Sequence, residues 1–382
     1  MEAVRAGASR RAVAARFGVG YGTVARALAR AGEAPLDAVA WSDRSTAPHR
    51  TRRTEPALEQ RVAEVRAELK AGILGDHGAV AIERVLRSAG DDRVPSVRTI
   101  ARIIERTGLL ERRRRVRRPA PPRGWYLPGV AAGQVELDAF DAIVDLPIFG
   151  RGHVDVLTGI SLHGGDPDAW PDTSITSGLT CRCLGERWAR IGYPAFAQFD
   201  NDTRFLGSHG YPDVLGAVPL FALEAGVTPV FAPLREMGFQ ASIEGFNALW
   251  QQRVYRRAFG MDLPALVTAS DRFIGALRAQ RAVRIEAAPP RRPGQADREE
   301  RFGHRSIIFL RRTTIAGAIE ILGRLYPVDR SWTHRLVRAE LDLDDLAIRC
   351  FALRRRDPTF QPLIAELPYR LPNRRAWVIR MY

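Results

Sequence analysis

Apolar residues recur at helical spacing in the first 32 residues. One amphipathic stretch runs from Arg10 to Phe17, with Ser9 before it as a helix N-cap and Gly18 after it as a left-handed terminator. A second helix is expected from near Thr23 to Arg30. The two helices would share a core of Val13, Phe17, Val19, Val24 and Leu28. Two helices joined by a short glycine-containing turn predict a helix-turn-helix over residues 1–32.

A second helical module is expected over residues 57–111, after a linker at 33–56 that is rich in Pro, Ala, Ser and Arg. Ser96 is placed to cap its last helix and Gly108 to end it. The apolar positions with helical spacing are Leu58, Val62, Val65, Leu69, Ile82, Val85, Leu86, Val97, Ile100, Ile103 and Ile104. This module is either a second DNA-binding unit or a dimerisation or spacer bundle.

Alternating apolar and polar residues predict strands in the middle segment, residues 133–262. The expected strands are 134–140, 154–157, 160–162, 195–199 and 227–232, and the expected helices are 175–190, 219–225 and 239–259. Hairpin-connected strands followed by alternating helices and strands indicate an α/β fold. Residues 301–382 carry short β runs, such as 332–341 and 346–353, which predict a small all-β barrel.

Charge divides the chain into three parts. The net charge of +15 consists of +12 over residues 1–132, −7 over 133–262 and +10 over 263–382. Basic segments attract polyanions, so double-stranded DNA is the first partner to consider, and an acidic middle suits divalent cations. A GC-rich genome would explain why arginine replaces lysine, but it would not explain the change of sign.

Composition excludes several classes of protein. Three cysteines are too few for a disulfide framework or for a cysteine-rich zinc site. The sequence has no apolar run of membrane-spanning length and no leader, which predicts a cytoplasmic protein with no membrane partner.

The candidate DNA contacts lie on the first module and on the basic linkers. On the helix-turn-helix plan, the residues that face DNA are Tyr21, Thr23, Arg26 and Arg30. Residues 112–132 form a proline-broken basic linker expected to lie along phosphates, through Arg112, Arg113, Arg114, Arg115, Arg117 and Arg118. Residues 263–300 are expected to form a second basic linker.

Three carboxylates stand where the α/β fold would place functional groups. Asp138 lies in the first strand, Asp200 ends the strand 195–199, and Glu244 lies in the first turns of the helix 239–259. Asn247 and Gln251 share the exposed side of that helix and are candidate DNA contacts. Three such carboxylates would hold two Mg²⁺ or Mn²⁺ ions for phosphoryl transfer. Two rival first ligands, Asp141 and Asp155, rank below Asp138.

Three segments resemble the acidic motifs of DDE transposases: Gln134–Asp138, Phe199–Phe205 and Ser242–Asn247. The group that they resemble most is bacterial insertion-sequence transposases with a retroviral-integrase-type core. The resemblance implies helix-turn-helix modules, a ribonuclease H-like core and an SH3-like barrel. It also implies a polynucleotidyl transferase that nicks element ends and joins the freed 3′-hydroxyl to target DNA. Two departures stand out: Asp202 replaces a usual glycine, and Met237–Ala241 replaces a Gly-Lys-rich approach to the glutamate.

The sequence thus predicts a multidomain, nucleoid-associated transposase that binds terminal repeats and target DNA as a homo-oligomer. A DNA-binding regulator with a repurposed or inactive integrase-like core is the alternative. A ribonuclease H-type nuclease would keep the metal chemistry but would leave the two N-terminal modules unexplained.

Overall fold

The computed structural model of the 382-residue chain forms two compact units, Met1–Leu58 and Glu59–Tyr382. The residues that it describes are 1–42, 54–90, 94–110, 123–149, 152–207, 212, 214–234, 236, 238–258, 260–293 and 305–370.

The first unit contains the two helices expected from the sequence. Its helices are α1 (Glu2–Arg5), α2 (Arg10–Phe17) and α3 (Tyr21–Ala31). Ser9 accepts a hydrogen bond from the amide of Ala12, and Gly18 ends α2 in the left-handed conformation, so both predicted caps are confirmed. The predicted core is wrong in part, because Phe17 is 61% exposed and Val19 is 42% exposed. The core is made instead by Val13, Ala14 and Val24.

A small helical bundle with its own core stands at the start of the second unit. Its helices are α4 (Pro56–Ala71, whose first residues belong to the first unit), α5 (Ala79–Ser88) and α6 (Val97–Arg106). Ser96 accepts a hydrogen bond from the amide of Thr99, which confirms it as the N-cap of α6. The buried core is Val62, Val65, Ile82, Leu86, Ile100, Ile103 and Ile104, all predicted from helical periodicity.

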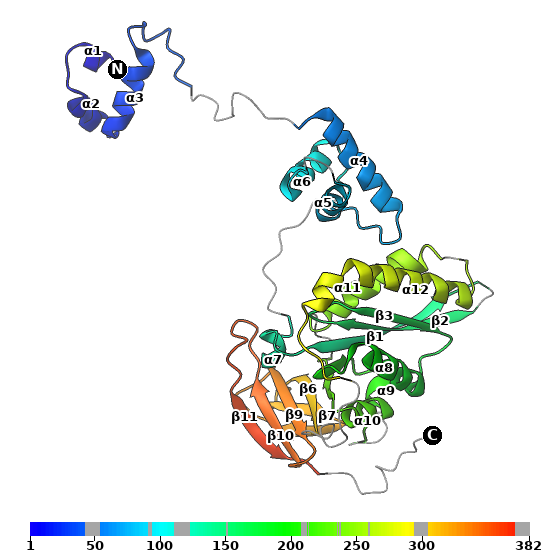
Figure 1. Cartoon of the computed structure of the whole chain (residues 1–382). Coiled ribbons are helices and arrows are strands. Elements are labelled where there is room, and N and C mark those ends of the chain that lie inside the picture. Colours follow the sequence, from blue (N-terminus) through cyan, green and yellow to red (C-terminus); the bar gives the residue numbers. More distant parts are fainter. Residues whose placement is uncertain are drawn as a thin grey trace. The chain divides into compact units, whose positions relative to one another are not determined.

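A single nine-stranded sheet dominates the second unit (Figure 1). Its strand order is β11-β10-β9-β6-β5-β4-β1-β2-β3. β1 pairs antiparallel with β2 and parallel with β4, and β5 continues the parallel part. These strands are β1 (Leu137–Pro147), β2 (His153–Ser161), β3 (Pro167–Asp172), β4 (Phe196–Phe199) and β5 (Thr228–Phe231). The expected α/β arrangement is present.

Helices cover both faces of this sheet, as Figure 1 shows. One face packs against α8 (Ser177–Ile191), α9 (Thr203–Leu206) and α10 (Ala217–Glu224). The other packs against α11 (Ala241–Trp250), the π-helical turn η1 (Gln251–Tyr255) and α12 (Leu263–Gln280). Because side chains alternate along a strand, Phe140 belongs to the α8 face, whereas Leu137, Ala139 and Ile143 belong to the α11 face.

The C-terminal strands differ from the predicted separate barrel. They are β6 (Ser306–Arg312), β7 (Ala318–Ile321), β8 (Arg324–Pro327), β9 (Leu336–Asp342), β10 (Ala347–Ala352) and β11 (Leu363–Pro368). β6 pairs in parallel with β5, and β9, β10 and β11 follow it antiparallel, so these strands extend the core sheet. β7 and β8 form a separate hairpin. The core and the C-terminal strands are joined by the pairing of β5 with β6, in which the apolar residue Val230 is opposite Ile308.

Two segments predicted as linkers are in part folded against the core. Residues 263–280 form α12, which buries Leu266, Phe273, Ile274 and Leu277, and α13 (Ala282–Glu286) follows it. Trp125, Tyr126 and Leu127, within the predicted linker 112–132, are buried beside α7 (Pro128–Ala131). β3 was not predicted from the sequence, because its two prolines resemble a turn; they are tolerated because this strand is at the sheet edge.

Candidate active site

Asp138 lies in a buried ion pair, apart from the other predicted ligands. Its side chain is fully buried, and it accepts hydrogen bonds from Arg187 Nε (3.0 Å) and from Arg291 Nη2 (2.6 Å). Trp188 Nε1 (3.3 Å) and Ser161 Oγ (3.0 Å) also donate to this carboxylate. Burial alone would raise the pKa of Asp138, but the two guanidinium groups outweigh burial and hold that pKa well below its usual range.

These contacts argue against the predicted role of Asp138 as a metal ligand. Both of its oxygens are engaged by fixed cations, which would compete with any metal ion and repel it. The physical reason is that successive side chains of β1 point to opposite faces of the sheet. Asp138 shares the α8 face with Phe140, whereas functional groups carried by α11 lie on the opposite face.

Asp141 lies on the α11 face, level with Asp200. Ala139 of β1 is opposite Gln198 of β4, so the same register carried two residues further places Asp141 beside Asp200. Each aspartate directly follows a phenylalanine of the α8 face, and the Phe140 and Phe199 rings stack at 5.5 Å. The repeated Phe-Asp pair was the sequence signal that could have identified Asp141.

Asn247 of α11 holds the Asp141 carboxylate. Its Nδ2 donates a hydrogen bond to Asp141 Oδ2 (2.7 Å), and its Oδ1 accepts one from Thr158 Oγ1 (2.7 Å). Asn247 is 8% exposed, so it is not the exposed DNA contact that the sequence suggested. Glu244 lies one helical turn before Asn247, which brings this glutamate to the same edge of the sheet.

Burial and like charges act together on Asp141. Desolvation, together with the charges of Asp200 and Glu244, raises the pKa of Asp141 from 3.8 to about 6. The hydrogen bonds from the Ala142 amide and from Asn247 oppose this rise without cancelling it. The charges of Asp200 and Glu244 therefore act on Asp141, and a cation bound at this edge would relieve that repulsion.

The loop after β4 fixes Asp200 firmly. Asp200 Oδ1 accepts a hydrogen bond from the amide of Asp202 (3.0 Å), and burial raises the pKa of Asp200. Asn201 Nδ2 donates to the carbonyl of Ala232 (2.6 Å) and its Oδ1 accepts from Arg311 (2.7 Å), which ties the loop to β5 and β6.

The unusual Asp202 has a structural use in this loop. It caps α9 and binds Arg204 through Nε (2.8 Å) and Nη2 (2.7 Å). Arg204 neutralises much of the charge that this replacement of glycine introduces next to Asp200.

The three carboxylates match a hard divalent cation in chemistry but are not gathered into a closed site. Among the residues that the structure describes, no three acidic, His or Cys side chains are gathered closely enough to hold a metal ion as they stand. Glu244 is exposed, and three like charges without a cation repel one another. The donor set is nevertheless all oxygen, the kind that Mg²⁺ and Mn²⁺ prefer.

The rival ligand Asp155 lies elsewhere. It accepts a hydrogen bond from the amide of Asp145 (2.9 Å) and lies 3.8 Å from Arg204. Gln251 begins η1 and is half-buried.

The predicted DNA contacts of the first unit differ in exposure. Tyr21, Thr23 and Arg26 are exposed on α3. Arg30 is half-buried, and its guanidinium donates hydrogen bonds to the carbonyls of Trp41 and Ser42. The predicted contacts Arg112, Arg113, Arg114, Arg115, Arg117 and Arg118 lie outside the described residues.

Two retroviral proteins are among the solved structures similar to this chain. The catalytic core domain of HTLV-2 integrase, in complex with magnesium and in trimeric form, has 13% identity and a TM-score of 0.29, over 37% of this chain and 84% of its own. The simian T-cell lymphotropic virus intasome, in complex with PP2A regulatory subunit B56 gamma, has 12% identity and a TM-score of 0.35, over 80% of this chain and 97% of its own. Both scores are low.

Neither the protein-family models nor the curated proteins compared with the chain match it. In the part of the chain that the structure describes, no helix is both long and apolar enough to cross a membrane.

Proposed function

We propose that this protein is a DNA transposase with integrase-type chemistry, and that Asp141, Asp200 and Glu244 are its metal ligands. The observation that supports this best is geometric. The register of β1 with β4 brings Asp141 level with Asp200, and Asn247 ties the helical turn after Glu244 to Asp141. This set replaces the predicted one at a single position, since Asp141 takes the place of Asp138.

The residues around the carboxylates prepare the site in distinct ways. Asn247 and the Ala142 amide orient Asp141, and the Asp202 amide orients Asp200. Glu244 is exposed on the first turn of α11, where it can move toward a bound cation. When two Mg²⁺ or Mn²⁺ ions are bound there, they supply Lewis acidity for the attacking and leaving oxygens of an in-line phosphoryl transfer.

The rest of the chain fits a DNA substrate. The helix-turn-helix of the first unit would find the element's terminal repeats through Tyr21, Thr23 and Arg26 of α3. The net charges of +12 and +10 on the flanking segments would hold the ends and the target DNA. Several copies of the chain would assemble on that DNA, since two ends are processed together.

A cleavage and joining assay tests the proposal. The substrate is duplex DNA that carries the genomic sequence flanking this gene, with Mg²⁺, Mn²⁺ or EDTA. We expect the wild type to cut only with a divalent cation, and D141N, D200N and E244Q to lose at least about a thousandfold in rate. D155N is the matched control, because Asp155 lies among the residues of the α8 face, and it should keep cleaving.

Three outcomes would count against this proposal. Retained cleavage by D141N would remove Asp141 from the ligand set, and equal losses in D141N and D155N would point to general damage. A wild-type protein that binds these ends but never cuts them would favour the DNA-binding regulator instead.

A further inference from the structure

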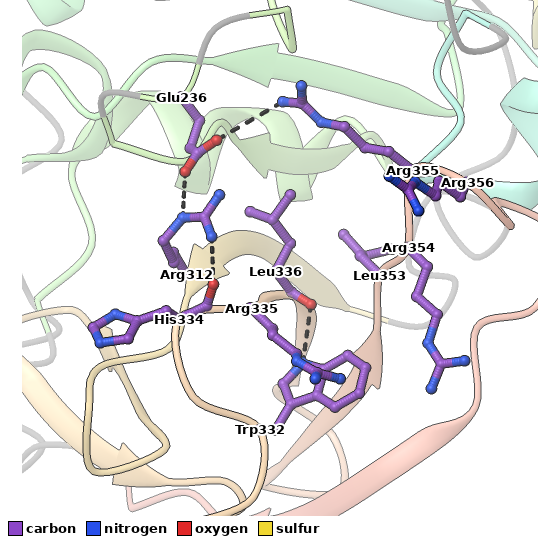
Figure 2. A pocket seen from close by; sticks show the side chains of 10 residues that line it. All are labelled: Glu236, Arg312, Trp332, His334, Arg335, Leu336, Leu353, Arg354, Arg355 and Arg356. Carbon is purple, nitrogen blue, oxygen red and sulfur yellow. Dashed lines mark hydrogen bonds and ion pairs between the residues drawn. The ribbon is translucent and has the colours of Figure 1, made fainter.

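A basic groove of about 610 Å³ lies beside the C-terminal strands (Figure 2). The described lining contains five arginines and one carboxylate, Glu236. Its aromatic element is Trp332, which is 8% exposed and donates a hydrogen bond to the carbonyl of Leu336 (3.3 Å). The site described above uses none of these residues.

Trp332 orders two of the arginines. The Arg335 guanidinium lies 4.6 Å from the centre of its ring and that of Arg354 lies 5.3 Å from it. Among the described residues, neither Arg335 nor Arg354 forms an ion pair, and both are exposed. Stacked arginines lose little further freedom when they bind an anion, so these two guanidiniums are prepared for one.

Glu236 occupies a place between two other arginines. Its carboxylate pairs with Arg312 Nε and lies 3.8 Å from Arg355 Nη2, as the dashed lines in Figure 2 show. The Glu236 side chain is 18% exposed, whereas Arg312 is 43% exposed and Arg355 is 47% exposed. A carboxylate held this way keeps two neighbouring cations from repelling each other.

We infer that this groove binds the phosphate backbone of DNA, and that a phosphate replaces the Glu236 carboxylate between Arg312 and Arg355. The groove offers planar guanidiniums at several points, which match successive phosphates better than a single compact anion. The inference rests on the proposed function, which makes DNA the substrate. It deepens that proposal, because Glu236 lies on the loop between β5 and α11, and α11 carries Glu244.

The test uses full-length D141N protein, so that binding is read without cleavage. The probe is a fluorescein-labelled duplex of about 30 bp and arbitrary sequence, in EDTA, titrated by anisotropy over a series of NaCl concentrations. We expect R335Q/R354Q to weaken binding about tenfold or more and to lower the salt slope by about one to two. E236Q should tighten binding several-fold and steepen the slope, because a competing carboxylate is removed.

The control is R182Q on α8, at a position that is 64% exposed and among the helices of the other face. It should leave both the affinity and the slope unchanged. If R335Q/R354Q behaves like R182Q, or if E236Q weakens binding, the inference is wrong. If R335Q/R354Q loses binding to a polyglutamate peptide but binds the duplex as before, the inference is overturned in favour of an acidic protein partner.

A second measurement needs no variant in the groove. Duplex DNA should slow amide hydrogen exchange in residues 332–336 and 353–356 of the D141N protein, and no protection there would also overturn the inference. If both groove tests fail but the wild type still cleaves and D141N does not, the proposed function is unaffected. If both groove tests succeed but the wild type never cleaves, the DNA-binding groove is supported and the transposase function is rejected.

Discussion

Two aspartates three residues apart on β1 have opposite environments. Asp138 is stabilised as an anion by Arg187 and Arg291, whereas burial and two carboxylates make the ionised form of Asp141 costly. A strand turns each successive side chain to the other face, so an odd spacing separates the two aspartates completely. That alternation explains why Asp138 pairs with arginines, whereas Asp141 lies on the face that is proposed to bind a cation.

Substituting each aspartate by asparagine should change stability in opposite directions. Without metal at pH 7.5, D138N should lose about 3–5 kcal/mol, because Arg187 would be left buried with less compensating charge. D141N should gain up to about 3 kcal/mol, the free energy that corresponds to its raised pKa. Urea denaturation in EDTA measures both values. Destabilisation of the two variants by the same amount would contradict the assignment.

The advantage of D141N should also depend on pH. In the wild type the pKa of the Asp141 carboxyl is raised from 3.8 to about 6, so well below pH 3.8 this group is protonated in both the folded and the unfolded chain, and no penalty exists. As the pH rises toward 6 the unfolded chain ionises first, and the wild type loses stability relative to D141N. Above 6 the difference should be constant. Paired denaturation curves from pH 4 to 8 measure it, and a flat difference throughout would exclude the raised pKa.

At the scale of elements, capping residues and helical periodicity are reliable, and partners across the sheet are not. Ser9, Gly18 and Ser96 mark helix ends because each acts on atoms within four residues. α12 was missed although Asp262 caps it and Leu266, Phe273 and Leu277 share one face, because the arginines and prolines further along resembled a linker.

The packing of α12 gives a direct test. L277A should lower the free energy of unfolding by about 2–5 kcal/mol, because Leu277 is 2% exposed in the core beneath the helix. V283A, on α13, is the control, since Val283 is 82% exposed. Thermal or chemical denaturation compares the two variants, and equal small effects would mean that this segment is a linker after all.

The DNA-recognition role proposed for α3 can be tested separately at its two arginines. Arg26 is exposed, whereas Arg30 holds the chain at Trp41 and Ser42. R26A should therefore weaken binding to the element's ends by about 1–3 kcal/mol without changing the melting temperature of the first unit. R30A should lower that melting temperature. A mobility-shift titration and a thermal melt distinguish them, and unchanged end binding by R26A would remove the groove-reading role.

At the scale of the second unit, its acidic residues and its C-terminal strands both serve the core. Asp166 and Asp168 form ion pairs with Arg190 and Arg278. Part of the negative charge of residues 133–262 is therefore neutralised within the fold. β6 supplies the next strand to β5, and the Phe231 and Phe309 rings stack at 5.3 Å across that junction. The core sheet depends on residues that the sequence assigned to another domain.

Truncation tests this dependence. A chain that ends at residue 293 lacks β6, β9, β10 and β11, and it would expose the apolar edge of β5 to solvent. We expect this variant to lose cooperative thermal unfolding and to be cut rapidly by proteases. Removal of residues 1–42 is the control and should leave the melting of the second unit unchanged. A truncated chain that stays folded would favour an independent barrel.

The sequence by itself determined the local structure of this protein. Caps and periodicity predicted α2, α3 and the core positions of the α4–α6 bundle, and most strands and helices of the middle segment apart from β3. They also placed Asp200 and Glu244 as candidate ligands, because such signals act between near neighbours. Only the tertiary structure decided that Asp141, and not Asp138, faces α11 and that Asn247 binds it. It also decided that the C-terminal strands join the core sheet beside β5. Each of these depends on strand register or on a distant partner, such as Arg291, which binds Asp138 across 153 positions. Contacts at that separation are fixed by the packing of the whole sheet, which no local pattern encodes.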